Sequence, residues 1–198
     1  MTRAGAAAIA TIIAIGGVIG CGGSSSGATT PTAPTTTTTT PATTVATMTL
    51  TSSAGANGGT LPADYTCDGT SASPPLAWTG APTGTKEFAL LMTTLPGDGT
   101  TKWNWVMYNI PAATSSLERN TTGIGKFGVG SDGPGAAYQP PCSQGPGLKL
   151  YTFTIYALSG SPVFTVPASQ ITGQVVTSAI ASLTLGSGAL NLGYTRAR

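Results

Sequence analysis

Residues 86–112 read "KEFALLMTTLPGDGTTKWNWVMYNIPA" and contain two stretches with the composition of β-strands. The stretches 86–93 and 103–110 are rich in apolar, β-branched or aromatic residues, and clusters of Gly, Pro or Thr bound them, as is typical of strands separated by a loop. The stretches "TMTLTSS" (47–53) and "LYTFTIYAL" (150–158) have the same character. Together these four stretches predict a core that is mostly β.

One stretch near the end of the chain has the periodicity of a helix instead. Ser169 is a candidate N-cap and Gly186 follows the predicted end, although Gly173 weakens the helical pattern. A short strand is predicted over 189–195, and the Gly/Pro-rich loop 120–147 has a length typical of functional or mobile segments. The apolar residues on one face of the predicted helix are Ile171, Val175, Val176, Ala179, Ile180 and Leu183.

The chain begins with a pattern of export. Arg3 precedes an apolar run that is too short to span a bilayer comfortably, so residues 1–20 are predicted to be a signal peptide. The following "VIGCGG" resembles the lipobox of bacterial lipoproteins, and that resemblance implies that Cys21 is diacylated and becomes the mature N-terminus. An ordinary signal peptide with an incidental cysteine is the alternative. The expected location is the bacterial cell envelope, at the outer membrane or cell surface.

A change of composition then divides the rest of the chain. Residues 22–46 are almost purely Gly, Ser, Thr, Pro and Ala, which cannot bury enough apolar surface to offset chain entropy. The predicted organisation is therefore a signal peptide over 1–20, a lipidated cysteine and disordered tether over 21–46, and one domain over 47–198. The formal net charge is +2 and only 7% of residues are charged, so neither a basic surface for nucleic acid nor an acidic tail is expected.

Two cysteines remain after Cys21, and their pairing is the favoured interpretation. An exported chain meets oxidising conditions in which disulfides persist, so Cys67 and Cys142 are predicted to form a disulfide. A thiolate nucleophile or metal ligand is the alternative, but the chain has no histidine and these cysteines have no CxxC spacing.

The usual catalytic motifs are weak or missing in this sequence. GxGxxG occurs twice within residues 123–133, but neither copy opens a convincing helix after a strand, so turn glycines are the simpler interpretation. Without histidine no Ser-His-Asp or Cys-His mechanism can be assembled. A pair of carboxylates could in principle act as in glycosidases, although most of the acids lie in turn contexts. We therefore expect no enzyme activity, no cofactor and no metal site.

Four ordered segments carry a family resemblance. They are 61–78, 86–112, 138–158 and 190–196, and the first contains "YTCDGTSASPPLAW". Together they resemble the bacterial branch of the phosphatidylethanolamine-binding protein family, also called Raf kinase inhibitor-like proteins. The resemblance implies a β-rich domain of packed antiparallel sheets with a few peripheral helices, which agrees with the strand composition.

The resemblance also implies a small anion-accepting pocket, and this chain departs from the family there. Relatives carry an Asp-Pro-Asp-x-Pro run and two histidines, whereas this chain has "TTLPGDG" at 93–99, Asn104 for the first histidine and Lys149 for the second. Threonine, asparagine and lysine do not titrate near neutral pH when unperturbed. Trp103 and Trp105 are expected to pack rather than to contact a ligand. The candidate ligand-binding residues are Thr94, Asp98, Asn104, Tyr138, Pro140, Lys149 and Tyr151.

Two functions follow as hypotheses. The first is a lipid-anchored envelope protein that binds a small anion or a phospholipid head group in the altered pocket. The second is a protein-interaction module, inhibitor-like in the manner of the family's kinase and protease inhibitors, whose pocket is a relict. Catalysis involving Asp98 is a distant third.

Overall fold

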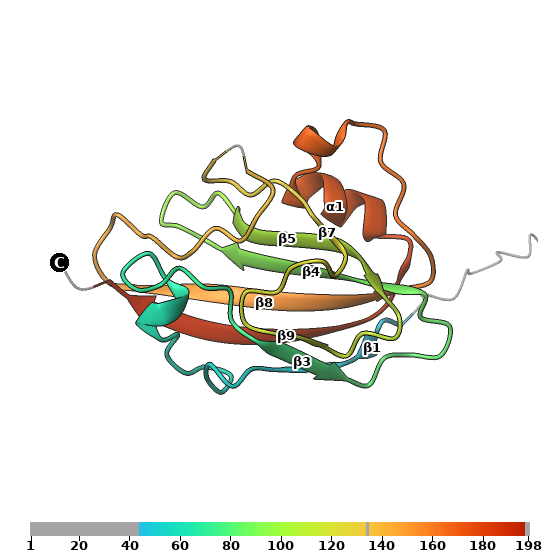
Figure 1. The fold of residues 1–198 in the computed structure, drawn as a ribbon, viewed down its shortest axis with the longest axis horizontal. Coiled ribbons are helices and arrows are strands. Elements are labelled where there is room, and N and C mark those ends of the chain that lie inside the picture. The colour runs from blue at the N-terminus through green and yellow to red at the C-terminus, as the bar shows by residue number, and fades with distance from the viewer. Residues whose placement is uncertain (1–43, 134, 197–198) are drawn as a thin grey trace, which may run out of the picture. The chain divides into compact units, whose positions relative to one another are not determined.

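The computed structural model describes residues 44–133 and 135–196, and its main element is a six-stranded sheet in the order β1-β9-β8-β4-β5-β7 (Figure 1). Neighbouring strands are antiparallel except for the parallel pair β1 and β9. The predicted lipidation site Cys21 and the predicted signal peptide lie outside the described residues. The strands of this sheet are β1 (Ala46–Thr47), β4 (Glu87–Thr94), β5 (Lys102–Pro111), β7 (Lys126–Phe127), β8 (Leu148–Leu158) and β9 (Thr184–Thr195).

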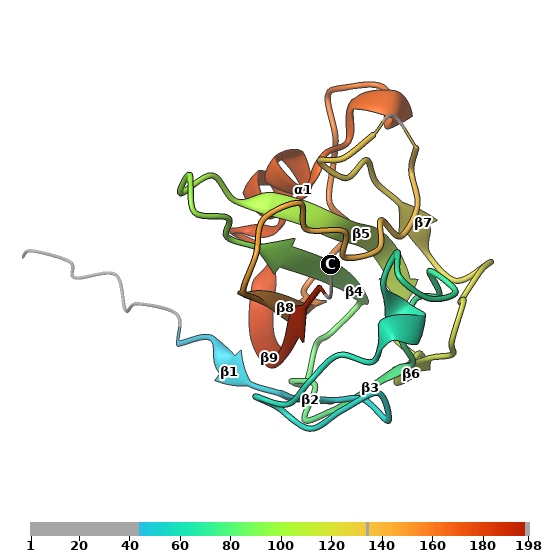
Figure 2. The same ribbon diagram turned by 90° about the vertical axis from the view of Figure 1, so that its left-hand side faces the viewer.

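A smaller antiparallel sheet packs against one face of the main sheet (Figure 2). It contains β2 (Thr49–Thr51), β3 (Leu76–Thr79) and β6 (Ser116–Leu117), in the order β2-β3-β6. The helices are one α-helix, α1 (Gly173–Ile180), and two short 3₁₀ turns, η1 (Ala63–Tyr65) and η2 (Ala168–Gln170), within the described ranges. The prediction of a mainly β domain of packed sheets with few helices is confirmed. No helix in the described part of the chain is long and apolar enough to cross a membrane.

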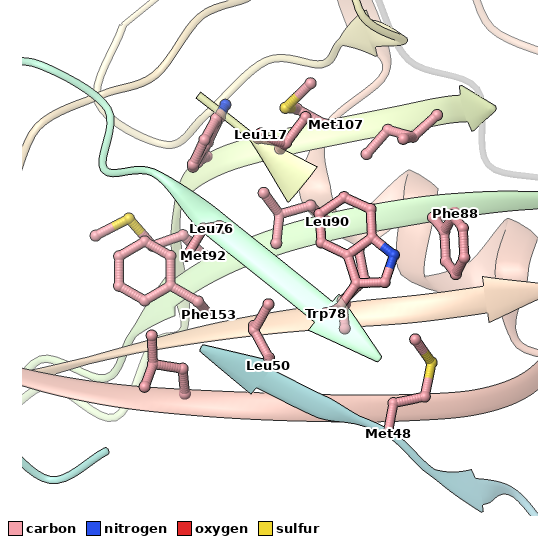
Figure 3. Packing of buried hydrophobic residues seen from close by; sticks show 14 of the residues in the cluster. Met48, Leu50, Leu76, Trp78, Phe88, Leu90, Met92, Met107, Leu117 and Phe153 are labelled. Atoms are coloured by element: carbon pink, nitrogen blue, oxygen red, sulfur yellow. The ribbon is translucent and has the colours of Figure 1, made fainter. Parts of the chain in front are cut away.

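β4 carries a continuous apolar run because both of its faces are buried. Phe88, Leu90 and Met92 lie in the core between the two sheets, whereas Ala89 and Leu91 belong to a second cluster on the α1 side. A strand buried on one face only would alternate apolar and polar residues. Other residues of the core between the sheets include Met48, Leu50, Leu76, Trp78, Met107, Leu117 and Phe153 (Figure 3).

Two bulges in β5 decide which side chains enter that core. Phe88 pairs with Ile110 and Leu90 with Met107, so two residues of β5 lie opposite one residue of β4. A bulge of this kind places an extra residue in one strand and changes the direction of the side chains that follow. Met107 and Ile110, three positions apart, therefore both lie in the core between the sheets.

The second bulge is at Asn104. Met92 pairs with Trp105 and Thr93 with Trp103, which leaves Asn104 as the extra residue. Residues two apart normally point to the same face of a strand, yet Trp105 lies in the core between the sheets and Trp103 packs with the α1 cluster. The prediction that both tryptophans pack is confirmed.

The predicted strands are found with shifted ends. The stretches 86–93, 103–110 and 150–158 correspond to β4, β5 and β8. The stretch 47–53 is not one strand, because the chain passes from the main sheet to the smaller sheet at Met48, whose N–H donates to the Ser187 carbonyl at 2.8 Å. β9 begins five residues before the predicted 189–195.

The helix is present, but its predicted ends were wrong. The N-cap is Thr172, whose hydroxyl oxygen accepts the N–H of Val175 at 3.3 Å, whereas Ser169 lies in η2. Gly186 lies within β9 instead of following the helix. Glycine is a poor helix former. It occupies position 173 for a steric reason, because a Cβ there would overlap the ring of Trp103.

Candidate functional site

All seven predicted ligand-binding residues line one cavity at the end of the main sheet. Its volume is about 680 Å³. Three parts of the chain form most of its wall: the turn between β4 and β5, the start of β8, and the loop between β7 and β8, which passes over this end of the sheet (yellow to orange in Figure 1). The predicted residues at the wall are Thr94, Asp98, Asn104, Tyr138, Pro140, Lys149 and Tyr151. Their role in binding stays a prediction.

Asn104 reaches the cavity wall from the second bulge of β5. Only 3% of the residue is exposed. Its Nδ2 donates to the Gln139 carbonyl at 3.3 Å, and its own carbonyl accepts the Gln139 N–H at 2.7 Å. Its Oδ1 is buried and has no hydrogen-bond partner among the described residues. A buried acceptor without a partner carries a desolvation penalty of about 1–3 kcal/mol, so this position is not optimised for stability alone.

The cavity wall carries balanced charge. The ammonium of Lys102 pairs with the Asp132 carboxylate at 2.9 Å. The Lys149 ammonium donates to the Pro146 carbonyl at 3.1 Å, and the Asp98 carboxylate accepts the Thr100 N–H at 2.9 Å. Two lysines and two aspartates therefore line the wall. Lys149 is the lysine without a carboxylate partner among the described lining residues.

Two tyrosines give the cavity neutral polar groups. Tyr138 donates its hydroxyl to the Tyr65 carbonyl at 2.6 Å, and its ring packs edge to face on Trp105 with centroids 5.3 Å apart. Burial raises the pKa of Tyr138 well above the usual value. Burial, with smaller contributions from the Asp132 and Tyr194 charges, raises the pKa of Tyr151 to about 12. Both phenols therefore stay protonated at neutral pH.

A disulfide closes the wall formed by the loop between β7 and β8. Cys67 and Cys142 are bonded at 2.06 Å, and both line the cavity. Beside the bond, the Cys67 N–H donates to the Pro141 carbonyl at 3.1 Å. The predicted disulfide is confirmed in the structure, and the alternative of a free reactive thiol or metal ligand is wrong for these two residues.

The "CDG" segment is tied to the last strand beside this wall. The Asp68 carboxylate accepts hydrogen bonds from the Tyr194 hydroxyl and the Arg196 Nε, each at 2.8 Å. The Tyr194 hydrogen bond, opposed by some desolvation and supported by Arg196, lowers the pKa of Asp68. A side chain added at Gly69 would overlap the Ala63 carbonyl, which explains a glycine after Asp68. The motif therefore has a structural role next to the cavity.

Several cavity residues were missed from the sequence. Lys102 and Asp132 form the ion pair described above, and Gln139 holds the loop in place by accepting the Asp132 N–H at 2.8 Å. Asp132 was not singled out from the sequence, because its position beside β5 depends on the folding of the long loop. No cluster of three His, Cys, Asp or Glu side chains suited to a metal occurs within residues 44–133 and 135–196.

The glycine-rich loop 123–133 has no dinucleotide-binding geometry. Its only regular element is the short β7, and no helix follows it directly. Gly123 and Gly125 have positive φ of 74° and 65°, as turn glycines do. Position 128 requires glycine for a different reason, because a Cβ there would come within 2.6 Å of Val106 and of the Ile171 carbonyl.

Comparison with known proteins places this arrangement in a family. Two packed sheets with a polar cavity at one end define the class, and residues 51–195 match the family model described as phosphatidylethanolamine-binding protein. The chain belongs to this family, as the sequence resemblance predicted. It is 35% identical over 116 residues to a UPF0098 protein of Methanothermobacter thermautotrophicus, covering 56% of this chain and 76% of that protein.

One relative has a name that bears on location. The chain is 32% identical over 144 residues to a protein of Mycobacterium tuberculosis named as a lipoprotein, LppC, covering 72% of this chain and 70% of the relative. Solved structures show the same fold. The homologue CT736 from Chlamydia trachomatis superposes with a TM-score of 0.69 at 24% identity, and YbcL of E. coli with 0.67 at 23%; each comparison covers 76% of this chain and 99% of the other.

Proposed function

We propose that this protein is a lipid-anchored binding protein of the cell envelope whose cavity holds a small anionic ligand or a phosphate head group. The observation that carries the binding proposal is the convergence of seven residues from separate segments on one cavity of about 680 Å³. Volumes of about 300–1,000 Å³ are typical of small-molecule sites. The Lys149 ammonium and the protonated Tyr151 hydroxyl supply donors for an anion at that wall.

The two carboxylates at the cavity wall refine the expected ligand. The carboxylates of Asp98 and Asp132 accept hydrogen bonds, so they favour a ligand that also carries an N–H or O–H donor. A small phosphate or carboxylate that carries a hydroxyl or amine therefore fits better than a bare anion.

Titration calorimetry tests the binding site. Inorganic phosphate and glycerol 3-phosphate are titrated into the wild type and into Lys149→Gln, with Lys126→Gln as the matched control, since Lys126 is exposed on β7 outside the cavity. Loss of a charge-assisted hydrogen bond should weaken binding about tenfold in Lys149→Gln. Equal affinities in all three proteins would contradict the proposed role of Lys149.

The competing function is protein interaction with a relict pocket. One observation favours it: both cavity lysines already contact protein groups, Lys102 the Asp132 carboxylate and Lys149 the Pro146 carbonyl. The absence of any heat of binding for both phosphate probes, together with a specific protein target, would support this alternative and overturn the first.

The proposal is a binding role and not catalysis. Asp98 and Asp132 share the cavity wall, so paired-carboxylate chemistry has a direct test. Hydrolysis of ester, glycoside or phosphate substrates by the wild type, lost in Asp98→Asn, would replace binding by catalysis.

Anchoring rests on the lipobox-like "VIGCGG" sequence around Cys21 and on the lipoprotein name of a relative. A thiol can carry the thioether-linked glyceride, and two acyl chains give stable membrane attachment. The wild type should partition into detergent and membranes, whereas Cys21→Ser should remain an unprocessed or mislocalised precursor. Wild-type protein released into the soluble fraction with an unmodified N-terminus would contradict the anchor.

A further inference from the structure

Three leucines form an exposed corner beside the cavity, which we call the leucine corner: Leu95, Leu148 and Leu150. Their exposed fractions are 66%, 68% and 52%, and only two other large hydrophobic residues of the described chain are comparably exposed. Single exposed leucines need no explanation, whereas clustered ones indicate a contact surface.

The strand register brings these leucines together. Leu148 and Leu150 alternate along β8 with Lys149 and Tyr151, so they share one face of that strand. Thr94 pairs with Tyr151 and donates its hydroxyl to the Leu150 carbonyl at 2.9 Å, which places the next residue, Leu95, beside Leu150.

The helix leaves this corner uncovered. α1 packs over residues of β4 and β5 and over the far end of β8 at Leu158, and Figure 1 shows it displaced from the end of β9 that adjoins the start of β8. Across the sheet, Leu148 Cδ1 lies 2.8 Å from where a Cβ on Gly193 would be. Gly193 thus gives Leu148 room to lie along the surface.

We propose that the leucine corner docks on the surface of the lipid membrane that holds the anchor. This rests on the proposed function. Leu148 and Leu150 lie on the face of β8 opposite to Lys149 and Tyr151, which line the cavity, so the corner and the cavity lie at the same end of the sheet on opposite faces. Exposed leucines on a domain that a lipid anchor holds near a membrane can enter the boundary of head groups and acyl chains.

The length of chain before the domain permits this orientation. β1 pairs with the start of β9, at the opposite end of the sheet from Leu148, which pairs with Thr195. From Tyr156, opposite Ser187, back to Leu148 the strand spans about 26 Å. The covalent chain from Cys21 to Thr44 can extend to at most about 80 Å. An anchor at Cys21 can therefore share a membrane with the leucine corner.

The test uses full-length lipidated protein reconstituted in phosphatidylcholine vesicles, with an environment-sensitive fluorophore on one introduced thiol. Leu150→Cys reports on the corner, and Val163→Cys is the matched control, because Val163 is 82% exposed and follows the other end of β8. Lipids with brominated acyl chains should reduce the Leu150→Cys emission about twofold, because the label enters the acyl boundary, and leave the Val163→Cys emission unchanged.

A second variant shows whether the leucines cause the docking. A label at Leu95→Cys should be quenched in the wild-type background and lose that quenching when Leu148→Ser and Leu150→Ser are added. These residues are exposed, so the substitutions leave the core intact. Quenching that persists without the two leucines would overturn the proposal.

The remaining outcomes are distinct. Protein that floats with the vesicles but shows no quenching at Leu150→Cys keeps its anchor and overturns only the docking. An emission shift at Leu150→Cys without bromine quenching means that protein covers the corner, a second copy or a partner, and also overturns the docking. Protein that does not float with vesicles at all overturns both the anchor and the docking.

Discussion

The two ends of β4, β5 and β8 differ in chemistry although they belong to the same strands. Away from the cavity they contribute Phe88, Met107 and Phe153 to a closed core between the sheets. At the other end they contribute Thr94, Asn104 and Lys149 to an open polar cavity. The bulge at Asn104 lies between these regions. Both regions contain a bulge of β5, but only the bulge at Asn104 brings a residue to the cavity wall.

The largest expected effect separates core from cavity directly. Phe153 is fully buried between the sheets, so Phe153→Ala should lower the free energy of unfolding by about 3–5 kcal/mol through lost burial and cavity formation. Thr94→Ala, at the cavity end of the neighbouring strand, removes one hydrogen bond and should cost about 1 kcal/mol. Urea unfolding of both variants measures the difference. Equal losses would mean that the cavity end is as tightly coupled to stability as the core.

The core was predictable because strand patterns are local. The residues 86–93, 103–110 and 150–158 contain their own apolar signal, and the core uses them as expected. The bulges were not predictable, because nothing in "WNWVMYNI" shows that Trp103 and Trp105 face opposite sides. That arrangement depends on the pairing of β5 with β4 and on α1, whose Gly173 accommodates Trp103.

The second expected effect concerns the disulfide at the cavity wall. Cys67 and Cys142 are 75 residues apart, and the chain-entropy model gives about 4 kcal/mol for closing a loop of this length. The double variant Cys67→Ala and Cys142→Ala should therefore unfold at lower urea concentration than the wild type. Phosphate binding should weaken as well, because the wall loop loses its covalent attachment. A variant with unchanged stability would show that the bond contributes only local order.

The third expected effect is a pH dependence that originates at the boundary between core and cavity. The pKa of Tyr151 is raised to about 12 from a reference of 10.0, mainly by burial. The stability from keeping this phenol protonated is therefore fully present below pH 10 and is lost as the pH rises toward 12, by about 2 kcal/mol.

Comparison of the wild type with Tyr151→Phe between pH 9 and 12 measures this contribution, since phenylalanine cannot ionise. The wild type should lose more stability than the variant over that range. Parallel curves would show that other groups, such as Tyr138, account for the alkaline loss.

The candidate site was predictable only in part, and for a different reason than the core. The seven predicted residues of the cavity wall were found through family motifs, since strand composition does not mark them. Lys102 lies within the segment 86–112 without being marked as a pocket residue, and Asp132 lies outside all four segments. The two come together only when the loop between β7 and β8 folds back over β5, where the Ser131 N–H donates to the Trp103 carbonyl at 2.8 Å. Contacts between residues this far apart in the sequence are set by tertiary structure, so local sequence patterns do not predict them.

The smallest expected effect concerns Asn104 and the loss of histidine from the cavity. With no histidine in the chain, no side chain with a reference pKa near neutrality lines the wall. Binding of sulfate, whose charge is constant above pH 4, should therefore be equally strong at pH 5.5 and pH 8 in the wild type.

In Asn104→His the imidazole becomes cationic at the lower pH and should tighten sulfate binding about threefold to tenfold there. Because only 3% of Asn104 is exposed, the larger imidazole should also lower the free energy of unfolding, so urea unfolding of the variant accompanies the titration. Calorimetric titration at the two pH values measures the effect, with Asn109→His at the other bulge of β5, outside the cavity wall, as the matched control. A pH-dependent wild type, or the same response in Asn109→His, would mean that charge near the cavity is not governed by the residue at 104.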